Sequence, residues 1–141
     1  MKKLITCFLI LFGLSGCKMD FVGDLYISDL ISVARSGEEI YSPMEMSFQV
    51  SSCNEDLTSI NNKIGSYFKD YKVIGCGTKD DFMSYISAKI SVPITNDLKN
   101  FNSQNKDLIG FWSKFSEDGK FTDVYLIVNR KKLDNLNDYV E

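Results

Sequence analysis

The chain has 141 residues, a length that suits one domain of ordinary size, with 16 basic and 19 acidic side chains and a net charge of −3 at pH 7. This acidic balance argues against a sequence-independent nucleic-acid binder, which needs a basic face to displace counterions from phosphates. The chain contains no histidine, so the commonest general base and the commonest protein ligand of metals are both missing.

The first 20 residues have the charged, apolar, small order of a secretory signal. Lys2 and Lys3 precede the uncharged run 4–14, and the segment Leu14-Ser15-Gly16-Cys17 closes it. The run is too short for a bilayer-crossing helix, which needs about 20 apolar residues. Its ending resembles the lipobox of bacterial lipoproteins. That resemblance implies cleavage before Cys17 and attachment of a diacylglyceryl group, with palmitate-type acyl chains, to this cysteine.

The resemblance also implies a domain organisation and a location. Residues 1–16 are expected to be the signal peptide and residues 17–141 a single mature domain, tethered to the membrane by acyl chains on Cys17. Lys18, rather than an aspartate, follows this cysteine, which implies an outer membrane, periplasm-facing position in a Gram-negative envelope. A host with a single membrane would display the protein on its surface. The overall plan is similar to small uncharacterised lipoproteins of bacteria and their prophages.

The first half of the mature domain shows two strand patterns and one helix pattern. Apolar residues of one parity predict an extended segment or two short strands near 21–34. A clearer alternation predicts a strand near 44–51 with Met44, Met46, Phe48 and Val50 on its core face. From Asn54, a plausible N-cap, the spacing changes to that of an amphipathic helix.

Cys53 and Cys76 remain after Cys7 leaves with the signal peptide and Cys17 is acylated. An even number of remaining cysteines in an exported protein predicts a disulfide. The bridge would close a loop of about two dozen residues, worth roughly 3 kcal/mol in the chain-entropy model. Two buried free thiols are the alternative. A metal site is weaker still, because two cysteines without histidine leave the coordination incomplete.

The second half ends in a hairpin and a helix. A strand is expected near 82–92, stopped by Pro93, and residues 94–106 are expected to form a surface connection. Asp118-Gly119 is a favoured hairpin turn between strands near 108–116 and 121–128. The corresponding register pairs Ile109 with Val128 and Trp112 with Tyr125. Residues 130–140 are expected to form a short helix after Asn129.

These elements predict an α+β domain: a mostly antiparallel sheet of about four to five strands, with one main helix and a short C-terminal helix. No motif points to catalysis, a cofactor or a metal. The glycines around Cys76 lack the spacing of a phosphate loop, and no Gly-x-Ser-x-Gly occurs. A Ser-Lys dyad stays open, but no particular pair stands out. We therefore expect a protein that is not an enzyme.

Trp112, Tyr125 and Ile127 share the second face of the hairpin, whose first face already supplies a core stripe. A second apolar face needs a cover. A helix, such as the terminal one, would bury it in the domain; otherwise it is a candidate surface for docking another envelope protein. The leading hypothesis is a non-enzymatic envelope lipoprotein that binds a partner protein. The alternatives are a carrier or sensor of a small apolar ligand and a purely structural envelope component.

Overall fold

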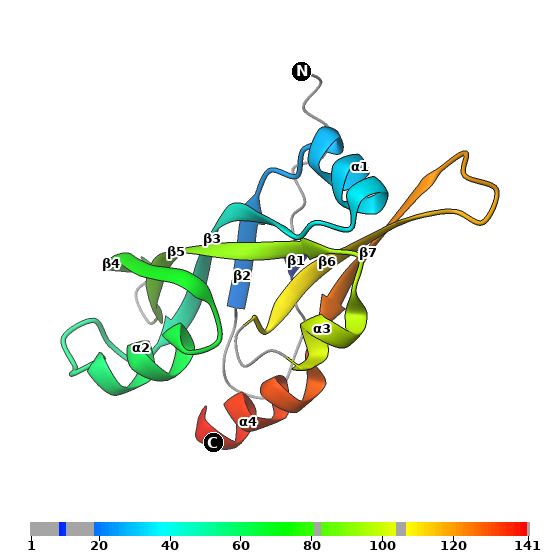
Figure 1. The fold of residues 1–141 in the computed structure, drawn as a ribbon. Helices are drawn as coiled ribbons and strands as arrows, with labels where there is room; N and C mark the ends of the chain where they lie inside the picture. Colours follow the sequence, from blue (N-terminus) through cyan, green and yellow to red (C-terminus); the bar gives the residue numbers. More distant parts are fainter. Residues whose placement is uncertain (1–8, 11–18, 81–82, 104–106, 141) are drawn as a thin grey trace.

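The computed structural model describes residues 9–10, 19–80, 83–103 and 107–140. Within these residues, seven strands form one sheet in the order β1-β2-β3-β5-β6-β7, and β4 pairs with β5 (Figure 1). The elements in chain order are β1 Leu9–Ile10, β2 Met19–Gly23, α1 Ile27–Ser36, β3 Ile40–Val50, α2 Thr58–Gly65, β4 Lys69–Asp80, β5 Met83–Thr95, α3 Leu98–Ser103, β6 Ile109–Phe115, β7 Thr122–Val128 and α4 Arg130–Val140. None of the helices in the described ranges has the length and apolar character needed to cross a membrane.

The long antiparallel pair of β3 and β5 forms the centre of the sheet, in register from Ile40 opposite Ile94 to Val50 opposite Ser84. Alternate residues of both strands enter one core, because successive side chains of a strand point to opposite faces. On β3 these are the four predicted residues Met44, Met46, Phe48 and Val50, all of which are buried. The predicted α+β architecture with a mostly antiparallel sheet is confirmed. One pair, β5 with β6, is parallel.

The prediction of an extended segment or two short strands near 21–34 is wrong for most of its length. Only β2 is extended there, and residues 27–36 form the helix α1. The alternation of Ile27, Ile31 and Val33 suggested a strand, but Leu30 completes a helical spacing with Ile27 and Ile31. Gly37, at φ 75°, ends the helix in the left-handed conformation that glycine adopts without steric cost, and its N–H bonds to Val33 O.

Other boundaries also differ from the prediction: α2 begins at Thr58, with Leu57 rather than Asn54 at its N-cap position. Residues 69–80 form β4, and α3 interrupts the expected surface connection. The strand β5 continues through Pro93 to Thr95. On one side of β5, the pairing with β4 ends at Ser91 and the pairing with β6 begins at Ile94. Pro93 lies between these two paired stretches. A proline fits where one edge of a strand lacks a ladder partner.

The C-terminal hairpin and helix match the prediction. Every predicted pair is present, from Ile109 opposite Val128 to Phe115 opposite Thr122. The helix α4 covers Arg130–Val140, and the Oδ1 of Asn129 accepts a hydrogen bond from the Lys132 N–H at 3.3 Å, as an N-cap does. Leu136 of this helix is buried in the core.

Candidate functional site

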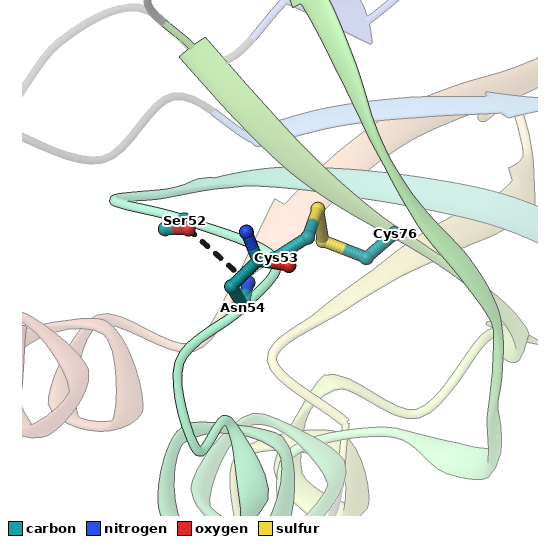
Figure 2. The surroundings of a disulfide bond; sticks show 4 residues. All are labelled: Ser52, Cys53, Asn54 and Cys76. Atoms are coloured by element: carbon teal, nitrogen blue, oxygen red, sulfur yellow. Dashed lines mark hydrogen bonds between the residues drawn. A yellow bond between two sulfur atoms is a disulfide. The ribbon is translucent and has the colours of Figure 1, made fainter.

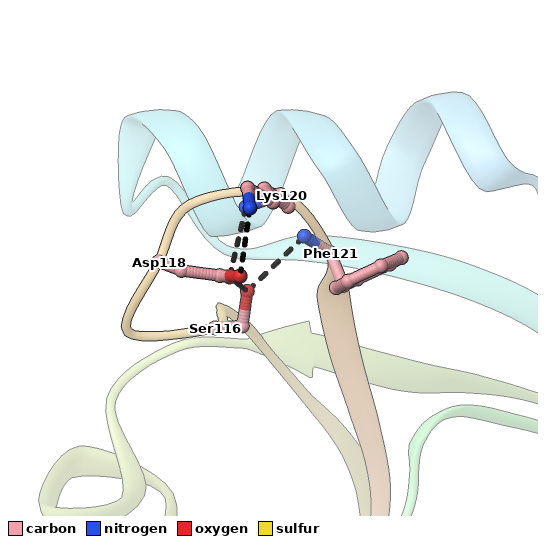
Figure 3. Close-up of polar contacts among 4 residues, drawn as sticks. All are labelled: Ser116, Asp118, Lys120 and Phe121. Carbon is pink, nitrogen blue, oxygen red and sulfur yellow. Dashed lines mark hydrogen bonds and ion pairs between the residues drawn. The ribbon is translucent and has the colours of Figure 1, made fainter.

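The β6–β7 hairpin ends in a tip that projects from the body of the domain (Figure 1). Its loop is held by two backbone hydrogen bonds, from Gly119 N to Ser116 O and from Ser116 N to Phe121 O, both 2.9 Å. The Asp118 carboxylate accepts further bonds from Ser116 Oγ at 2.6 Å and Lys120 N at 3.1 Å (Figure 3), which lower the pKa of this carboxyl below its usual value. The loop is longer than the predicted two residues, yet it keeps the predicted register because it is centred on the same pair.

Trp112 and Tyr125 lie directly opposite each other, with ring centroids 5.3 Å apart and planes tilted by 35°. The Trp112 indole N–H donates to Asn96 O at 3.1 Å, which fixes the ring against the segment that precedes α3. The Lys114 ammonium lies 4.7 Å from the centroid of the Trp112 ring, a cation–π distance. The predicted pairing of the two aromatic residues is therefore present, and one of the two rings is anchored.

We define the hairpin face as Trp112, Lys114, Tyr125 and Ile127, which share one side of the two strands, together with Phe121 of the loop just before β7. Tyr125 is 48% exposed and Phe121 is 68% exposed. Trp112 and Ile127 are half-buried. The sequence prediction did not include Phe121, although its place beside the Asp118-Gly119 turn was the available signal.

Among the described side chains, a helix covers the base of this face, and that helix is α3 rather than the terminal one. A Cβ atom at Gly110 would lie 2.8 Å from the ring of Phe101, so α3 packs directly on the backbone of β6 there. Leu133 and Leu136 of α4 instead pack with the central core. α3 therefore closes the base of the face, and Tyr125 and Phe121 toward the tip remain exposed to solvent. The docking role of the face stays a prediction.

The predicted disulfide is present. Cys53 lies in the loop between β3 and α2, and its Sγ is bonded to that of Cys76 in β4 (Figure 2). Cys76 lies opposite Ile86 of β5, so the bridge joins this loop to the central sheet. The candidate lipidation residue, Cys17, and most of the expected signal peptide fall outside the described residues.

A polar cluster that the sequence did not indicate consists of Asp107, Tyr41 and Lys132, and we call it the Asp107 group. The side chain of Asp107 is 2% exposed, and the backbone of this residue has φ 73°. The Tyr41 hydroxyl donates to Asp107 Oδ2 at 3.3 Å, and Lys132 Nζ donates to Asp107 O at 3.3 Å. Within the described residues, Asp107 Oδ1 has no hydrogen-bond partner. Burial raises the pKa of this carboxyl above its usual value, and burial likewise raises the pKa of Tyr41.

The Asp107 group joins β3, the start of β6 and α4, and it lacks the composition of a metal centre. No group of three or more His, Cys, Asp or Glu side chains that could hold a metal ion occurs in the part of the chain that the structure describes. Lys132, whose ammonium bonds to the Asp107 carbonyl, adds a positive charge beside the carboxylate. We assign the group a role in holding α4 to the sheet.

No curated protein and no solved structure matches this chain. Residues 22–141 match a family model described as a domain of unknown function (DUF7424). This span begins within β2 and includes the hairpin, both cysteines of the bridge and the Asp107 group. The chain therefore belongs to the DUF7424 family.

Proposed function

We propose that the protein is a non-enzymatic, lipid-anchored envelope protein that binds another envelope protein through the hairpin face. One observation carries this proposal: Tyr125 and Phe121 present large rings to solvent on a projecting hairpin, although the other side of the same strands already supplies the core. Aromatic residues are enriched among the residues that contribute most to protein binding, because they bury a large area at small entropic cost.

The rigidity of the hairpin face supports the same proposal. Trp112 is fixed by its bond to Asn96 O, and Tyr125 packs against it. The loop bonds of Ser116 and Asp118 hold the tip that carries Phe121. A surface ordered before binding loses less conformational entropy when a partner docks, so more of the contact energy remains as affinity.

The expected anchor would hold the domain that carries this face at a membrane. The strand β2 begins at Met19, so a lipidated Cys17 would be joined to the sheet through Lys18 alone. Two or three acyl chains give stable membrane attachment without a polybasic segment. We propose the outer membrane, facing the periplasm, as the location in a Gram-negative host, in line with Lys18 after the cysteine.

The docking surface is tested by in-membrane crosslinking and affinity capture of a tagged protein. The variant Phe121→Ser with Tyr125→Ser removes the two exposed rings and leaves the anchored Trp112 in place. The matched control is Val73→Ser with Ile74→Ser, which removes two apolar side chains of 40% and 52% exposure from β4. We expect a discrete partner with the wild type and the control, and its loss with the hairpin variant. Equal capture by both variants would contradict the docking role of the face.

The anchor is tested separately by Cys17→Ser. We expect this variant to leave the membrane fraction, because the remaining apolar run is too short to span a bilayer and no acyl chain can be attached. Fractionation of cells with an alkaline wash measures the distribution. Retention of Cys17→Ser in the washed membranes, at the level of the wild type, would show that acylation is not the attachment.

A further inference from the structure

The three edges of the sheet differ in how they are protected from pairing with another strand. β1 pairs with β2 but lies within residues 1–16, the expected signal peptide, so in the mature domain β2 is itself an edge strand, of only five residues. The edge strand β4 has register irregularities at three places and carries Lys69 and Lys72, which are devices that keep an edge from pairing. The edge strand β7 has neither: it pairs with β6 without a bulge, and it contains no proline, glycine or lysine.

The backbone groups that β7 turns outward can be assigned from the ladder. Phe121 O accepts a bond from Ser116 N, and Asn129 N donates to Leu108 O, so odd-numbered residues of this strand face β6. In an antiparallel ladder the facing positions alternate, so the N–H and C=O of Thr122, Val124 and Leu126 point away from β6. No described strand lies on that side, since β7 ends the strand order. The helix α1 bonds to Ser113 of β6 through Leu30 O, yet Val124, opposite Ser113, remains 40% exposed.

We infer that β7 pairs with the β7 strand of a second copy of this chain, antiparallel and about a two-fold axis at Val124, to join two sheets into one. A row of unpaired N–H and C=O groups can form hydrogen bonds with another extended backbone. Under a two-fold axis, the β7 edge of each copy pairs with the β7 edge of the other. This inference concerns the strand edge and does not depend on the proposed docking function of the hairpin face.

Asp123, the one charged residue of β7, distinguishes three candidate positions of the two-fold axis. A two-fold axis at Asp123 would place two carboxylates opposite each other, which is unfavourable. An axis at Tyr125 would place Asp123 opposite Ile127 of the second copy, which offers the carboxylate no donor. An axis at Val124 places Asp123 opposite Tyr125 of the second copy, whose hydroxyl can donate to it.

The same register also matches the apolar residues. With the axis at Val124, the exposed Phe121 lies opposite the half-buried Ile127 of the second copy, and Thr122 lies opposite Leu126. The two Val124 side chains meet at the axis on the other side of the joined sheet. The exposed apolar residues of the two strands therefore lie side by side on the joined sheet, and the two hairpin faces become one continuous surface.

Single cysteines in the full-length protein test both the pairing and its register in native membranes. The variants are Asp123→Cys, Val124→Cys and Tyr125→Cys, and each self-crosslinks best when the two-fold axis passes through its own position. The matched control is Val73→Cys, because Val73 lies on the other exposed edge strand with the same 40% exposure as Val124. The wild type gives the background of the native cysteines, and intact formation of the Cys53–Cys76 bridge confirms that each variant folds.

After mild oxidation we expect Val124→Cys to form a disulfide-linked dimer of this chain faster than the two neighbouring variants, and Val73→Cys to give only the wild-type background. Faster dimer formation by Asp123→Cys or Tyr125→Cys would overturn the register. A Val124→Cys band at background, or one that contains a different protein, would overturn pairing with a second copy. Copies with Val124→Lys, which sets two ammonium groups together at the axis, should lose co-capture of tagged with untagged chains, whereas Val73→Lys should keep it.

Discussion

Asp107 shows how one residue can oppose stability locally while it organises its surroundings. Its backbone adopts a left-handed conformation that is uncommon for residues other than glycine, asparagine and aspartate, and its carboxylate is buried with one oxygen unpartnered among the described residues. In return it accepts the Tyr41 hydroxyl bond, and its carbonyl accepts the Lys132 ammonium bond. The cost of the buried charge is the reason that the pKa of this carboxyl is raised.

Asp107→Asn should raise the free energy of unfolding at neutral pH, by about 1 kcal/mol, because it removes a buried charge and keeps an acceptor for Tyr41. The folded pKa of Asp107 lies above its unfolded value of about 3.9, so the native state binds more protons and loses stability as the pH rises between the two values. The gain from asparagine should therefore shrink near pH 4. Urea unfolding at about pH 4 and pH 7 measures it.

Asp118→Asn is the control, because the pKa of Asp118 is shifted in the opposite direction from that of Asp107. Hydrogen bonds lower the folded pKa of Asp118, so this carboxylate contributes stability above its unfolded pKa and loses it as the pH falls. We expect asparagine there to leave the protein no more stable at neutral pH. A gain at neutral pH for Asp118→Asn, or none for Asp107→Asn, would contradict the assignment of the cost to the buried carboxylate.

At the scale of elements, the contact between α3 and β6 decides which part of the hairpin face stays open. The helix has six residues and places Phe101, 2% exposed, against the backbone of Gly110. Asp97 begins the helix, since its Oδ1 accepts bonds from the N–H groups of Lys99 and Asn100 at 3.0 Å. A mostly polar stretch with one buried residue, Phe101, thus forms a helix because the glycine opposite leaves room for that ring.

Gly110→Ala should lower the free energy of unfolding by about 1–3 kcal/mol, because the new methyl group would overlap Phe101 and approach the carbonyl of Pro93 within 3.2 Å. Gly75→Ala in β4 is the matched control. Nothing lies within 4 Å of a Cβ atom there, so we expect no loss. Urea unfolding of both variants is the measurement, and equal effects would contradict the close packing of α3 on β6.

At the scale of the whole molecule, the disulfide links the loop before α2 to the strand after it, and thereby joins a peripheral helix to the central β3–β5 pair. The bridge spans a sequence separation of 23 residues. In this region Ile64 and Phe68 reach the core, while most of β4 is exposed. The bridge therefore supplements a part of the fold that buries comparatively few side chains.

Replacement of both Cys53 and Cys76 by serine should lower the free energy of unfolding by about 3 kcal/mol, the loop-closure value for a bridge of this span. Chemical unfolding of the wild type in reductant should show the same loss, which separates the effect of the bond from that of the serines. A loss below about 1 kcal/mol in both experiments would mean that the contacts of α2 hold this region without the bond.

The sequence by itself determined the features that depend on neighbouring residues or on fixed periodicity. The alternation of Met44 to Val50 defined a core strand, Asp118-Gly119 set the register that brings Trp112 opposite Tyr125, and Asn129 marked the start of the last helix. The parity of the cysteine count predicted the bridge between Cys53 and Cys76. Each of these is a local or pairwise constraint, so it can be read along the chain.

The tertiary structure decided what depends on contacts between distant segments. The period of Ile27 to Val33 was ambiguous until Leu30 and Val33 packed against the sheet, and α3 forms because Phe101 meets Gly110. Asp107 is buried and accepts hydrogen bonds from Tyr41 and Lys132, and no pattern in the polar sequence around it predicts this burial. The exposure of Tyr125 and of the β7 edge likewise follows from where the helices end. Burial is a property of the packed chain, which is why the candidate surface could be named from sequence but its open part could not.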